Sequence, residues 1–404
     1  RHRHMTRRRM LGCCGAAAAA MFSSLVTAAP QGPAPLPPPL ADMAAQALDG
    51  LAPAALWDCH AHLLGVGDAG SGCRIHDNMT RGFNLIERLR KRFILDAAGV
   101  DGDAPSVDQA YVQRMLDLAR AFPAGARWML FAFDDALDDN GRVRPDWTTF
   151  HVPDRYAAAV AAARPDRFAW VASVHPYRED ALARLADAVA NGAQAMKWLP
   201  SAMNIDLRDP RAGAFCDRLA ALRMPLIVHC GEEKAVPGAG QDELVNPLLV
   251  RHALERGTRV IVAHCASLGQ ALDLDQTRPE KRPACELVAR LMDEPRWQGQ
   301  LLADVSGVFQ SNRDAATWHT VLARTDWHPR LLHGSDYPLP GLGLLFRLGT
   351  LVRAEVLAEA DVEPLSQLRR HNPLLFDLVL RRRLRHRGQG FARSVFDTRR
   401  HFRG

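Results

Sequence analysis

Histidine and acidic side chains recur at the ends of short apolar segments in this sequence of 404 residues. The set comprises His60 and His62 in WDCHAH, His229 in LIVHC, His264 in VIVAHC and Asp336 in HGSDYP. Neutral imidazoles with one carboxylate suit zinc or a neighbouring transition metal, and they leave room for a water molecule whose pKa the metal lowers. The pattern predicts one divalent metal, most simply zinc, held by His60, His62, His229 and Asp336.

The first two histidines are two residues apart, and side chains two apart on a strand face the same way. His60 and His62 can therefore bind one ion, and we expect Cys59 to point away from it. A His-x-His pair is also common in ordinary strands. The placement of His229 and Asp336 at the ends of further apolar segments makes coincidence a poor explanation.

Eight apolar segments read as strands, and several of them are separated by segments with helical periodicity. The expected strands are 55–62, 127–134, 167–175, 193–199, 225–230, 259–265, 301–307 and 330–336. Repeated strand–helix units predict a parallel sheet, and eight of them predict an α/β fold of the (β/α)8 TIM-barrel type as a single catalytic domain. In such a barrel the carboxyl ends of the strands meet at one face, which would gather the proposed ligands. The long stretch 63–123 is expected to form an excursion over that face and to shape the pocket.

The flanking segments have a different composition. Residues 1–29 hold TRRRMLG, an apolar run and small residues at 26–28, which is typical of a twin-arginine-type export signal and predicts a periplasmic or secreted protein. A Pro-rich linker at 30–41 follows, then the barrel at 42–377 and a basic C-terminal extension at 378–404. We expect that extension to be a solvated last helix and tail.

Composition narrows the function further. The net charge of +6 comes largely from arginines near the two ends, so nucleic-acid binding is not expected. No apolar run in the body is long enough to span a bilayer, so no membrane span is expected. The cysteines beyond the signal show no disulfide or zinc-knuckle spacing, and mostly free buried thiols are expected. Nucleotide-binding glycine loops and a serine-nucleophile elbow are not found at convincing positions. A small-molecule substrate is expected, and a homodimer is possible.

The ordered motifs WDCHAH, AMKWLP, LIVHCGEE, VIVAHCASLG and HGSDYP resemble the amidohydrolase superfamily. Within it they are most similar to the branch that includes the aminocarboxymuconate-semialdehyde decarboxylase relatives. The resemblance spans roughly Leu56 to Phe376, and it implies a distorted (β/α)8 barrel.

The resemblance also implies roles for single residues. His60 and His62 correspond to the first-strand ligands, His229 to the fifth-strand ligand and Asp336 to the eighth-strand ligand. His264 resembles the sixth-strand histidine that polarises the substrate or shuttles a proton. Asp336 is in addition placed to take a proton from water and return it to the leaving group.

Further residues are candidates for substrate or supporting contacts. Lys197 in AMKWLP matches a lysine that, in two-metal members of the superfamily, is carboxylated and bridges the ions; beside a single metal it can instead bind an anionic substrate group. We favour one metal. The residues that follow other predicted strands and could contact substrate or support a ligand are His175, Arg178, Glu232 and Glu233.

The leading hypothesis is a metal-dependent hydrolase that acts on an amide, lactone or ester bond of a small substrate that carries a carboxylate. A non-oxidative decarboxylase or hydratase of the same superfamily is the alternative, because the resembling branch uses a nearly identical ligand set. An inactive barrel that acts as a binding protein is the second alternative.

Overall fold

The computed structural model describes residues 35–79, 85–236 and 238–402. The proposed export signal therefore lies outside the described residues. The Pro-rich segment does not stay extended to residue 41, because helix α2 (Pro38–Leu48) already begins within it. Proline is well tolerated in the first turn of a helix, where the missing N–H has no partner to lose.

Parallel strands form the centre of the molecule. They are β1 (Trp57–His62), β3 (Arg127–Phe131), β5 (Phe168–Val171), β6 (Met196–Trp198), β7 (Leu226–His229), β8 (Val260–Ala263), β11 (Leu301–Asp304) and β12 (Leu331–Leu332). They pair as β1-β3-β5 and as β12-β11-β8-β7-β6. A parallel bridge from Ala172 to Met196 joins β5 to β6, and one from Ala61 to Tyr337 joins β1 to the segment after β12.

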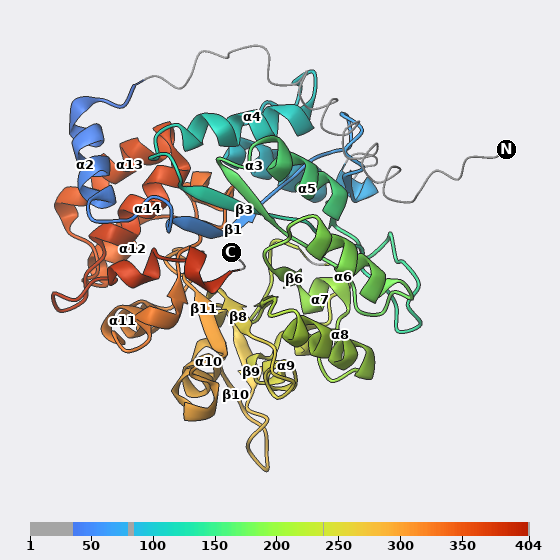
Figure 1. Cartoon of the computed structure of the whole chain (residues 1–404). Helices are drawn as coiled ribbons and strands as arrows, with labels where there is room; N and C mark the ends of the chain where they lie inside the picture. Colours follow the sequence, from blue (N-terminus) through green and yellow to red (C-terminus); the bar gives the residue numbers. More distant parts are fainter. Residues whose placement is uncertain (1–34, 80–84, 237, 403–404) are drawn as a thin grey trace.

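These two bridges close the sheet into a barrel, so the predicted (β/α)8 fold is confirmed. Each of the eight expected strands overlaps one of these strands, and all eight are shorter than expected. Figure 1 shows the helices arranged as an outer layer around the strands. That layer holds α3 (Leu85–Ala98), α4 (Val107–Ala119), α5 (Asp154–Ala163), α6 (Ala181–Ala190), α7 (Pro200–Met203), α8 (Pro210–Ala221), α9 (Arg251–Leu254), α10 (Ala284–Asp293), α11 (Ala315–Ala323), α12 (Leu348–Arg353), α13 (Val362–His371) and α14 (Pro373–Arg383).

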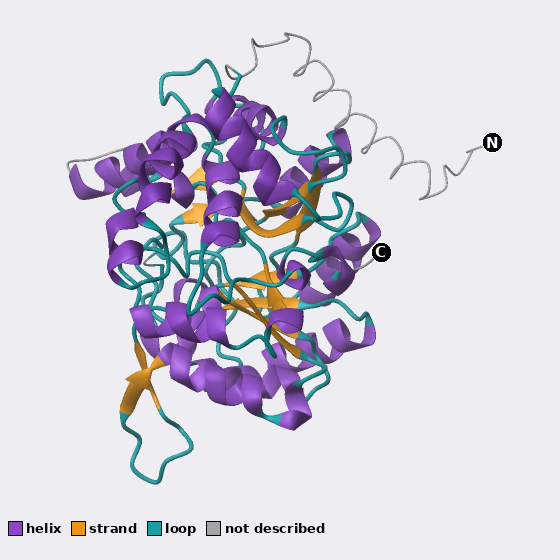
Figure 2. Ribbon diagram, turned by 90° about the vertical axis from the view of Figure 1, so that its left-hand side faces the viewer, coloured by secondary structure: helices purple, strands orange, loops and turns teal. Residues whose placement is uncertain are grey.

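Two short antiparallel ladders lie outside the barrel. One pairs β2 (Arg74–Ile75) with β4 (Phe150–His151), and the other pairs β9 (Gln270–Leu272) with β10 (Lys281–Pro283). The second forms a hairpin that projects from the body of the protein (Figure 2).

The barrel interior is a small apolar cluster to which all eight strands or their flanks contribute, including Cys59, Phe131, Ile227 and Leu332. The expectation that Cys59 points away from the site side of β1 is therefore wrong. The pairing of β1 with β3 shifts register between Asp58 and Ala61. A β-bulge of this kind interrupts the strict alternation of side chains, so both Cys59 and His60 can face inward.

The basic C-terminal segment is not the solvated tail that its charge predicts. Helix α14 is largely buried, and Arg381 within it is only 2% exposed. The last described residues close the amino end of the barrel: the Thr398 hydroxyl accepts a hydrogen bond from the Trp57 N–H at 3.0 Å, and Phe402 joins the interior cluster. In Figure 1 this segment, in red, lies close to the strands.

The excursion after β1 is organised by one buried carboxylate. Asp108 accepts hydrogen bonds from the backbone N–H groups of Val66 (2.6 Å) and Gly67 (3.1 Å) and from the Ser71 hydroxyl (2.5 Å). Asp108 therefore connects α4 to the loop that follows the two histidines of β1. Tyr111 of the same helix donates to the His62 carbonyl at 2.7 Å, so the excursion also supports the site.

Within the described ranges, no helix combines the length and the apolar character needed to cross a membrane. The six cysteines there are all free, and five of them are buried.

Candidate metal centre

His60 lies at the centre of the site and is 1% exposed. Its Nδ1 lies 2.9 Å from Oδ2 of Asp304, the last residue of β11. An Nδ1–H that donates to this carboxylate leaves Nε2 as the free ligand atom, which lies 3.6 Å from Oδ1 of Asp336. Burial, followed by the charge of Lys197, holds the pKa of His60 well below its usual value, so the ring is neutral and able to bind a metal.

Asp336, which follows the eighth strand, lies beside the two histidines of the first strand. Its Oδ1 lies 3.1 Å from Nε2 of His62, and the ligand atoms of His60, His62 and Asp336 all lie within 4.8 Å of one another. The strand pairing explains why they meet: the Asp336 N–H donates to the His60 carbonyl at 2.7 Å, and the His62 N–H donates to the Tyr337 carbonyl at 2.9 Å. Three of the four predicted ligands are therefore gathered by the closure of the barrel.

Asp58 fixes the bulged part of β1. Its Oδ1 accepts the N–H of His60 at 3.1 Å and that of Ser335 at 2.9 Å. Burial raises the pKa of Asp58 to about 6. This carboxyl thus holds the first strand against the segment that carries Asp336.

His264 follows β8 and lies against His60, with 4.6 Å between the ring centroids. Its Nδ1 is 2.8 Å from the carbonyl oxygen of Ser306. This contact occupies Nδ1, and Nε2 has no part in it. The backbone at His264, Cys265 and Ala266 is left-handed, with φ of 56°, 50° and 46°. A left-handed backbone is strained in residues other than glycine, and such strain is typical of functional sites. Here Asp304 stabilises the turn, because it accepts the His264 N–H at 3.0 Å.

His229, the fourth predicted ligand, ends β7 and is buried. Its ring centroid lies 5.3 Å from that of His264, but its nitrogen is not part of the three-residue group around Asp336. Nε2 of His229 is buried and has no hydrogen-bond partner among the described residues, although Oε2 of Glu233 lies 3.3 Å away. Burial lowers the pKa of His229. A buried nitrogen without a hydrogen bond is costly unless something else binds it, and a metal ion would do so.

Lys197 on β6 is 3% exposed, with Nζ 5.2 Å from the centre of the Phe131 ring. Burial lowers its pKa, while the carboxylates of Asp304 and Asp336 act in the opposite direction. Lys197 is therefore buried within range of the charges of the carboxylates that contact the histidines.

Of the two glutamates after β7, Glu233 lies against a histidine. Besides its contact with His229, Oε1 of Glu233 accepts the N–H groups of Ala235 and Val236 at 2.5 and 3.0 Å, which fixes the carboxylate in place. Glu232 is exposed and pairs with Lys234 at 3.4 Å. Both glutamates were candidates for contact with substrate or support of a ligand, and of the two only Glu233 contacts a histidine in the described structure.

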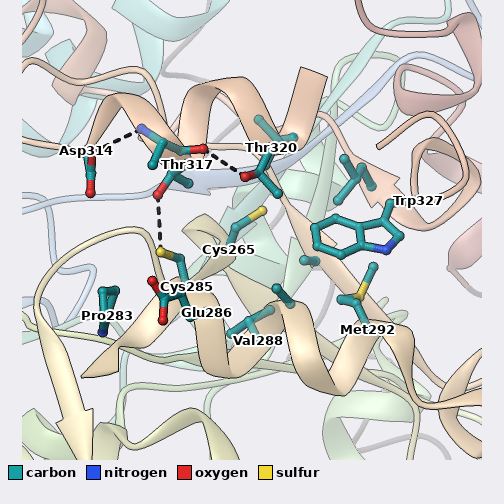
Figure 3. Close-up of a pocket in the computed structure, with 15 residues that line it drawn as sticks. Cys265, Pro283, Cys285, Glu286, Val288, Met292, Asp314, Thr317, Thr320 and Trp327 are labelled. Atoms are coloured by element: carbon teal, nitrogen blue, oxygen red, sulfur yellow. Dashed lines mark hydrogen bonds between the residues drawn. The ribbon is translucent and has the colours of Figure 1, made fainter. Parts of the chain in front are cut away.

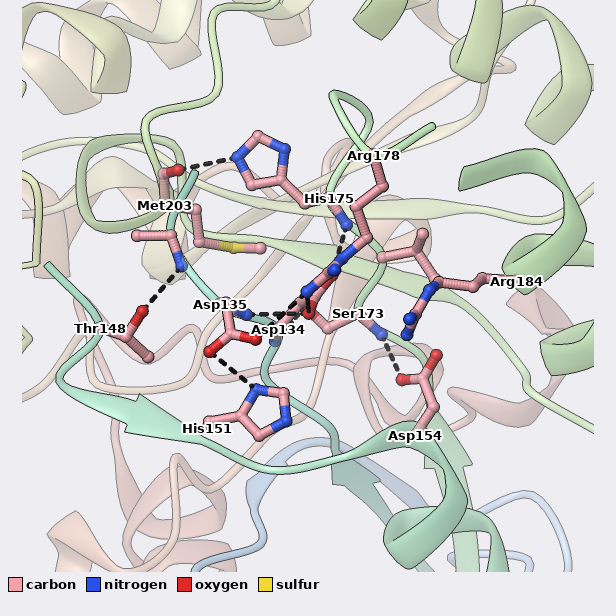
Figure 4. Close-up of polar contacts among 12 residues, drawn as sticks. Asp134, Asp135, Thr148, His151, Asp154, Ser173, His175, Arg178, Arg184 and Met203 are labelled. Atoms are coloured by element: carbon pink, nitrogen blue, oxygen red, sulfur yellow. Dashed lines mark hydrogen bonds and ion pairs between the residues drawn. The ribbon is translucent and has the colours of Figure 1, made fainter. Parts of the chain in front are cut away.

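Arg178 belongs to a different group, the Asp134 cluster, which consists of Asp134, Asp135, His151 and Arg178 (Figure 4). His175 lies beside this cluster, and its N–H donates to Oδ2 of Asp134 at 2.8 Å. Arg178 donates to both oxygens of Asp134 at 2.7 and 2.6 Å, and to Asp135 at 3.2 Å. Both ring nitrogens of His175 are also used, by the Met203 carbonyl at 2.8 Å and the Tyr177 N–H at 3.1 Å. The contacts of His175 and Arg178 are thus with protein groups of this region rather than with the metal centre.

A hollow lies between α10 and α11 (Figure 3). Cys265, next to His264, reaches into it, and the Thr317 hydroxyl contacts the Cys285 sulfur at 3.2 Å. The rest of the lining is mainly apolar, and none of the predicted site residues lines this hollow.

Asp304 was not among the residues predicted from the sequence, although it is fully buried and contacts both His60 and His264. A carboxylate inside an otherwise apolar strand, LLADVSG, is a signal that could have identified it, because such a group is costly unless it is paired. His60, His264 and Asp304 form a second set of ligand atoms within 4.8 Å.

Donor chemistry and burial agree with the binding of a divalent metal. The ligand atoms of His60, His62 and Asp336 converge, and His229 offers an unpaired buried nitrogen nearby. Fold and site together define a metal-dependent enzyme built on a (β/α)8 barrel.

A family model for amidohydrolases, Amidohydro_2, matches residues 57–374, and the chain belongs to this family. This confirms the resemblance to the branch related to aminocarboxymuconate-semialdehyde decarboxylase. A search of curated proteins gives no match.

Several solved structures are similar at low identity. An uncharacterized TIM-barrel protein from Bordetella bronchiseptica is 18% identical, with a TM-score of 0.46, and the match covers 70% of this chain and 86% of that one. A proposed 2-pyrone-4,6-dicarboxylic acid hydrolase from Pseudomonas putida is 16% identical, with a TM-score of 0.42 and coverages of 80% and 97%. A 5-carboxyvanillate decarboxylase from Novosphingobium aromaticivorans is 14% identical, with a TM-score of 0.38 and coverages of 74% and 89%.

Proposed function

We propose that this protein is a hydrolase that uses one divalent metal ion, zinc in the simplest case, to cleave an amide, lactone or ester bond of a small substrate that carries a carboxylate. The observation that carries the proposal is the convergence of the ligand atoms of His60, His62 and Asp336 at the carboxyl ends of the strands, where His60 and Asp336 are buried. His229 completes the proposed ligand set.

A bound ion of this kind supplies Lewis acidity and lowers the pKa of water towards neutrality. Asp304 prepares the site for it, because its contact with Nδ1 of His60 fixes the ring orientation and the tautomer. The same carboxylate accepts the His264 N–H and so sets the position of a second ring.

Asp336 is the proposed proton acceptor. Its Oδ1 faces His60 and His62, which leaves Oδ2 to take the proton of an attacking water and deliver it to the leaving group. Hydrolysis requires this return of the proton to a leaving group. His264 is proposed to act as a proton shuttle through Nε2, which can accept a proton because the Nδ1–H donates to the Ser306 carbonyl.

Lys197 is proposed to bind an anionic group of the substrate beside a single metal. Its buried ammonium lies near carboxylates that are not paired with it by a hydrogen bond in the described structure, so it can be attracted by a further anion without losing a partner. The two-metal alternative, with a carboxylated Lys197 as bridge, predicts a different metal content.

The test is elemental analysis of protein purified without chelator, combined with turnover on a panel of esters, lactones, amides and aromatic carboxylic acids. One equivalent of metal, lost in His60→Ala and kept in Lys197→Ala, with hydrolysis of a panel member, supports the proposal. Two equivalents that fall in Lys197→Ala would establish the bridged site. Carbon dioxide release without hydrolysis would establish a decarboxylase, and protein without metal would overturn the central claim.

We also propose export through the twin-arginine-type signal, on the strength of residues 1–29 alone. Fractionation of cells that express the full chain, compared with a variant in which Arg7 and Arg8 are replaced by Lys, tests this. Equal distribution of both proteins would contradict it.

A further inference from the structure

A buried glutamine lies beside the metal centre on the loop between β11 and α11. Gln310 is 2% exposed, and its amide nitrogen Nε2 is buried without a hydrogen-bond partner among the described residues. An amide N–H left unpaired in a buried place costs free energy, so a position like this is retained where something else accepts its hydrogens.

Gly307 locates this amide relative to the reacting groups. A Cβ atom placed on Gly307 would lie 3.2 Å from Oδ2 of Asp336 and 3.3 Å from Nε2 of Gln310. The two side chains therefore border the same small volume, which the glycine leaves open. Its φ of 62° also suits glycine better than other residues.

Arg313 fixes the direction of the glutamine side chain. Its Nη2 donates to Oε1 of Gln310 at 3.3 Å, and because a guanidinium can only donate, the carbonyl end of the amide must face it. The NH2 end is then turned away from Arg313. Nε of Arg313 is itself buried without a partner in the described structure.

The charge of Arg313 acts within the site. This positive charge acts on His229 and on His264. The charges of Asp336, Glu233 and Glu232 act in turn on the guanidinium of Arg313. None of these carboxylates forms an ion pair with Arg313 in the described structure. An added anion would therefore find a guanidinium with free hydrogen-bonding capacity.

The loop that carries the pair is held in place. The Ser311 N–H donates to the Leu345 carbonyl at 2.7 Å, the Ser311 hydroxyl accepts the Arg347 N–H at 2.6 Å, and the Trp318 indole donates to the Val308 carbonyl at 2.7 Å. A fixed loop presents its donors without an ordering cost when a ligand binds.

We propose that Gln310 and Arg313 form the subsite that binds a carboxylate of the substrate, next to the metal centre. The proposal rests on the proposed function, since it assigns one group of that substrate. A carboxylate provides two acceptor oxygens for the two unpaired donors and a negative charge for the guanidinium. A neutral carbonyl group would satisfy one donor and leave the charge without a partner.

The test uses malonate and its neutral analogue malonamide as probes on the zinc-loaded full chain, with dissociation constants from calorimetry. Wild-type protein should prefer malonate. Arg313→Met and Gln310→Leu should each weaken malonate binding by about tenfold, and Arg313→Met should remove the preference over malonamide. Arg313→Lys keeps the charge but loses the planar pair of donors, and it should lie between wild type and Arg313→Met.

Exposed residues provide matched controls: Arg353→Met and Gln367→Leu should bind malonate as wild type does. Metal content is measured in every variant. Full metal content with wild-type malonate affinity in both Arg313→Met and Gln310→Leu would overturn the subsite while leaving the proposed function intact. Absence of metal from the wild-type protein would instead overturn the proposed function. If Arg313→Met does not fold, Arg313→Lys and Gln310→Leu decide the question.

Discussion

The metal centre and the Asp134 cluster are built from the same residue types, yet they suit different tasks. In each, carboxylates and histidine offer ligand atoms within 4.8 Å of one another. In the Asp134 cluster, Arg178 bonds both oxygens of Asp134, and Arg74 pairs with Asp135 at 2.5 Å. The acidic groups there are already neutralised, whereas His60, His62 and Asp336 face one another without a paired arginine in the described structure.

The position of the cations therefore distinguishes the two groups. A carboxylate with a bidentate arginine has little to gain from a metal ion, because that charge-assisted pair must be broken first. Lys197 lies near the metal centre without a hydrogen bond to its carboxylates in the described structure, so the site keeps its ligand capacity. A count of His, Asp and Glu in a small volume does not identify a metal site until the nearby cations are considered.

The strongest test of this difference is ligand removal. His60→Ala should abolish metal binding and reduce activity to background, because it removes the ligand at the centre of the group. The parallel change His151→Ala, in the Asp134 cluster, should leave the metal content unchanged. Elemental analysis of both proteins checks this, and equal metal loss in the two would break the comparison.

Asp336→Asn should lower kcat by about 10²- to 10⁴-fold, the usual contribution of a positioned proton acceptor. An amide keeps the shape of the side chain and an oxygen ligand but cannot take the proton. Turnover is compared at equal metal content after reloading. A variant with full activity would remove Asp336 from the proton transfer.

Asp304→Asn should weaken metal affinity by about 10- to 100-fold, as expected for a carboxylate that orients a histidine ligand. Competition with a chelator measures this. The control Asp135→Asn removes a carboxylate of the other group and should leave metal affinity as it is. A wild-type affinity in Asp304→Asn would show that the 2.9 Å contact with His60 is dispensable.

Arg178→Met should reduce the free energy of unfolding by about 3–5 kcal/mol, because it leaves buried carboxylates without their cation. Although burial acts to raise the pKa of Asp134, the hydrogen bond and charge of Arg178 hold it below the usual value. Denaturant unfolding measures the loss, and metal content should be retained. Loss of metal without loss of stability would assign Arg178 to the active site after all.

The smallest expected effect is a pH dependence near the same cluster. Burial lowers the pKa of His175 to about 4, so the unfolded chain binds this proton more readily than the folded one between about pH 6.5 and 4. The stability contributed by the neutral ring is present above about pH 6.5 and is lost as the pH falls through this window. His175→Gln should therefore show a smaller fall in Tm from about pH 7 to about pH 4.5.

This measurement is made in the His60→Ala background, so that release of metal at low pH does not contribute. The same fall in Tm with and without His175 would remove the histidine as its source.

Sequence patterns predicted the strands well because alternation and apolar runs are local properties. They also placed His60, His62 and Asp336 at strand ends, and the barrel brought these residues together. They could not foresee the bulge in β1, since a register shift depends on the partner strand, and they misplaced Cys59 for that reason. His175 and Arg178 follow β5 beyond its last paired residue, where alternation no longer fixes the direction of a side chain.

The sequence by itself determined the order of strands and helices, the candidate ligand residues and the family, because these depend on residue identity and short-range periodicity. Only the tertiary structure decided which acidic groups meet an arginine, that Asp304 supports His60, that Gln310 and Arg313 border the site, and that the basic C-terminal segment is packed under the barrel. These outcomes depend on contacts between residues far apart in the chain, such as Ser311 with Leu345 and Thr398 with Trp57. In the C-terminal segment, burial of apolar side chains outweighs the local preference of the charged residues for water.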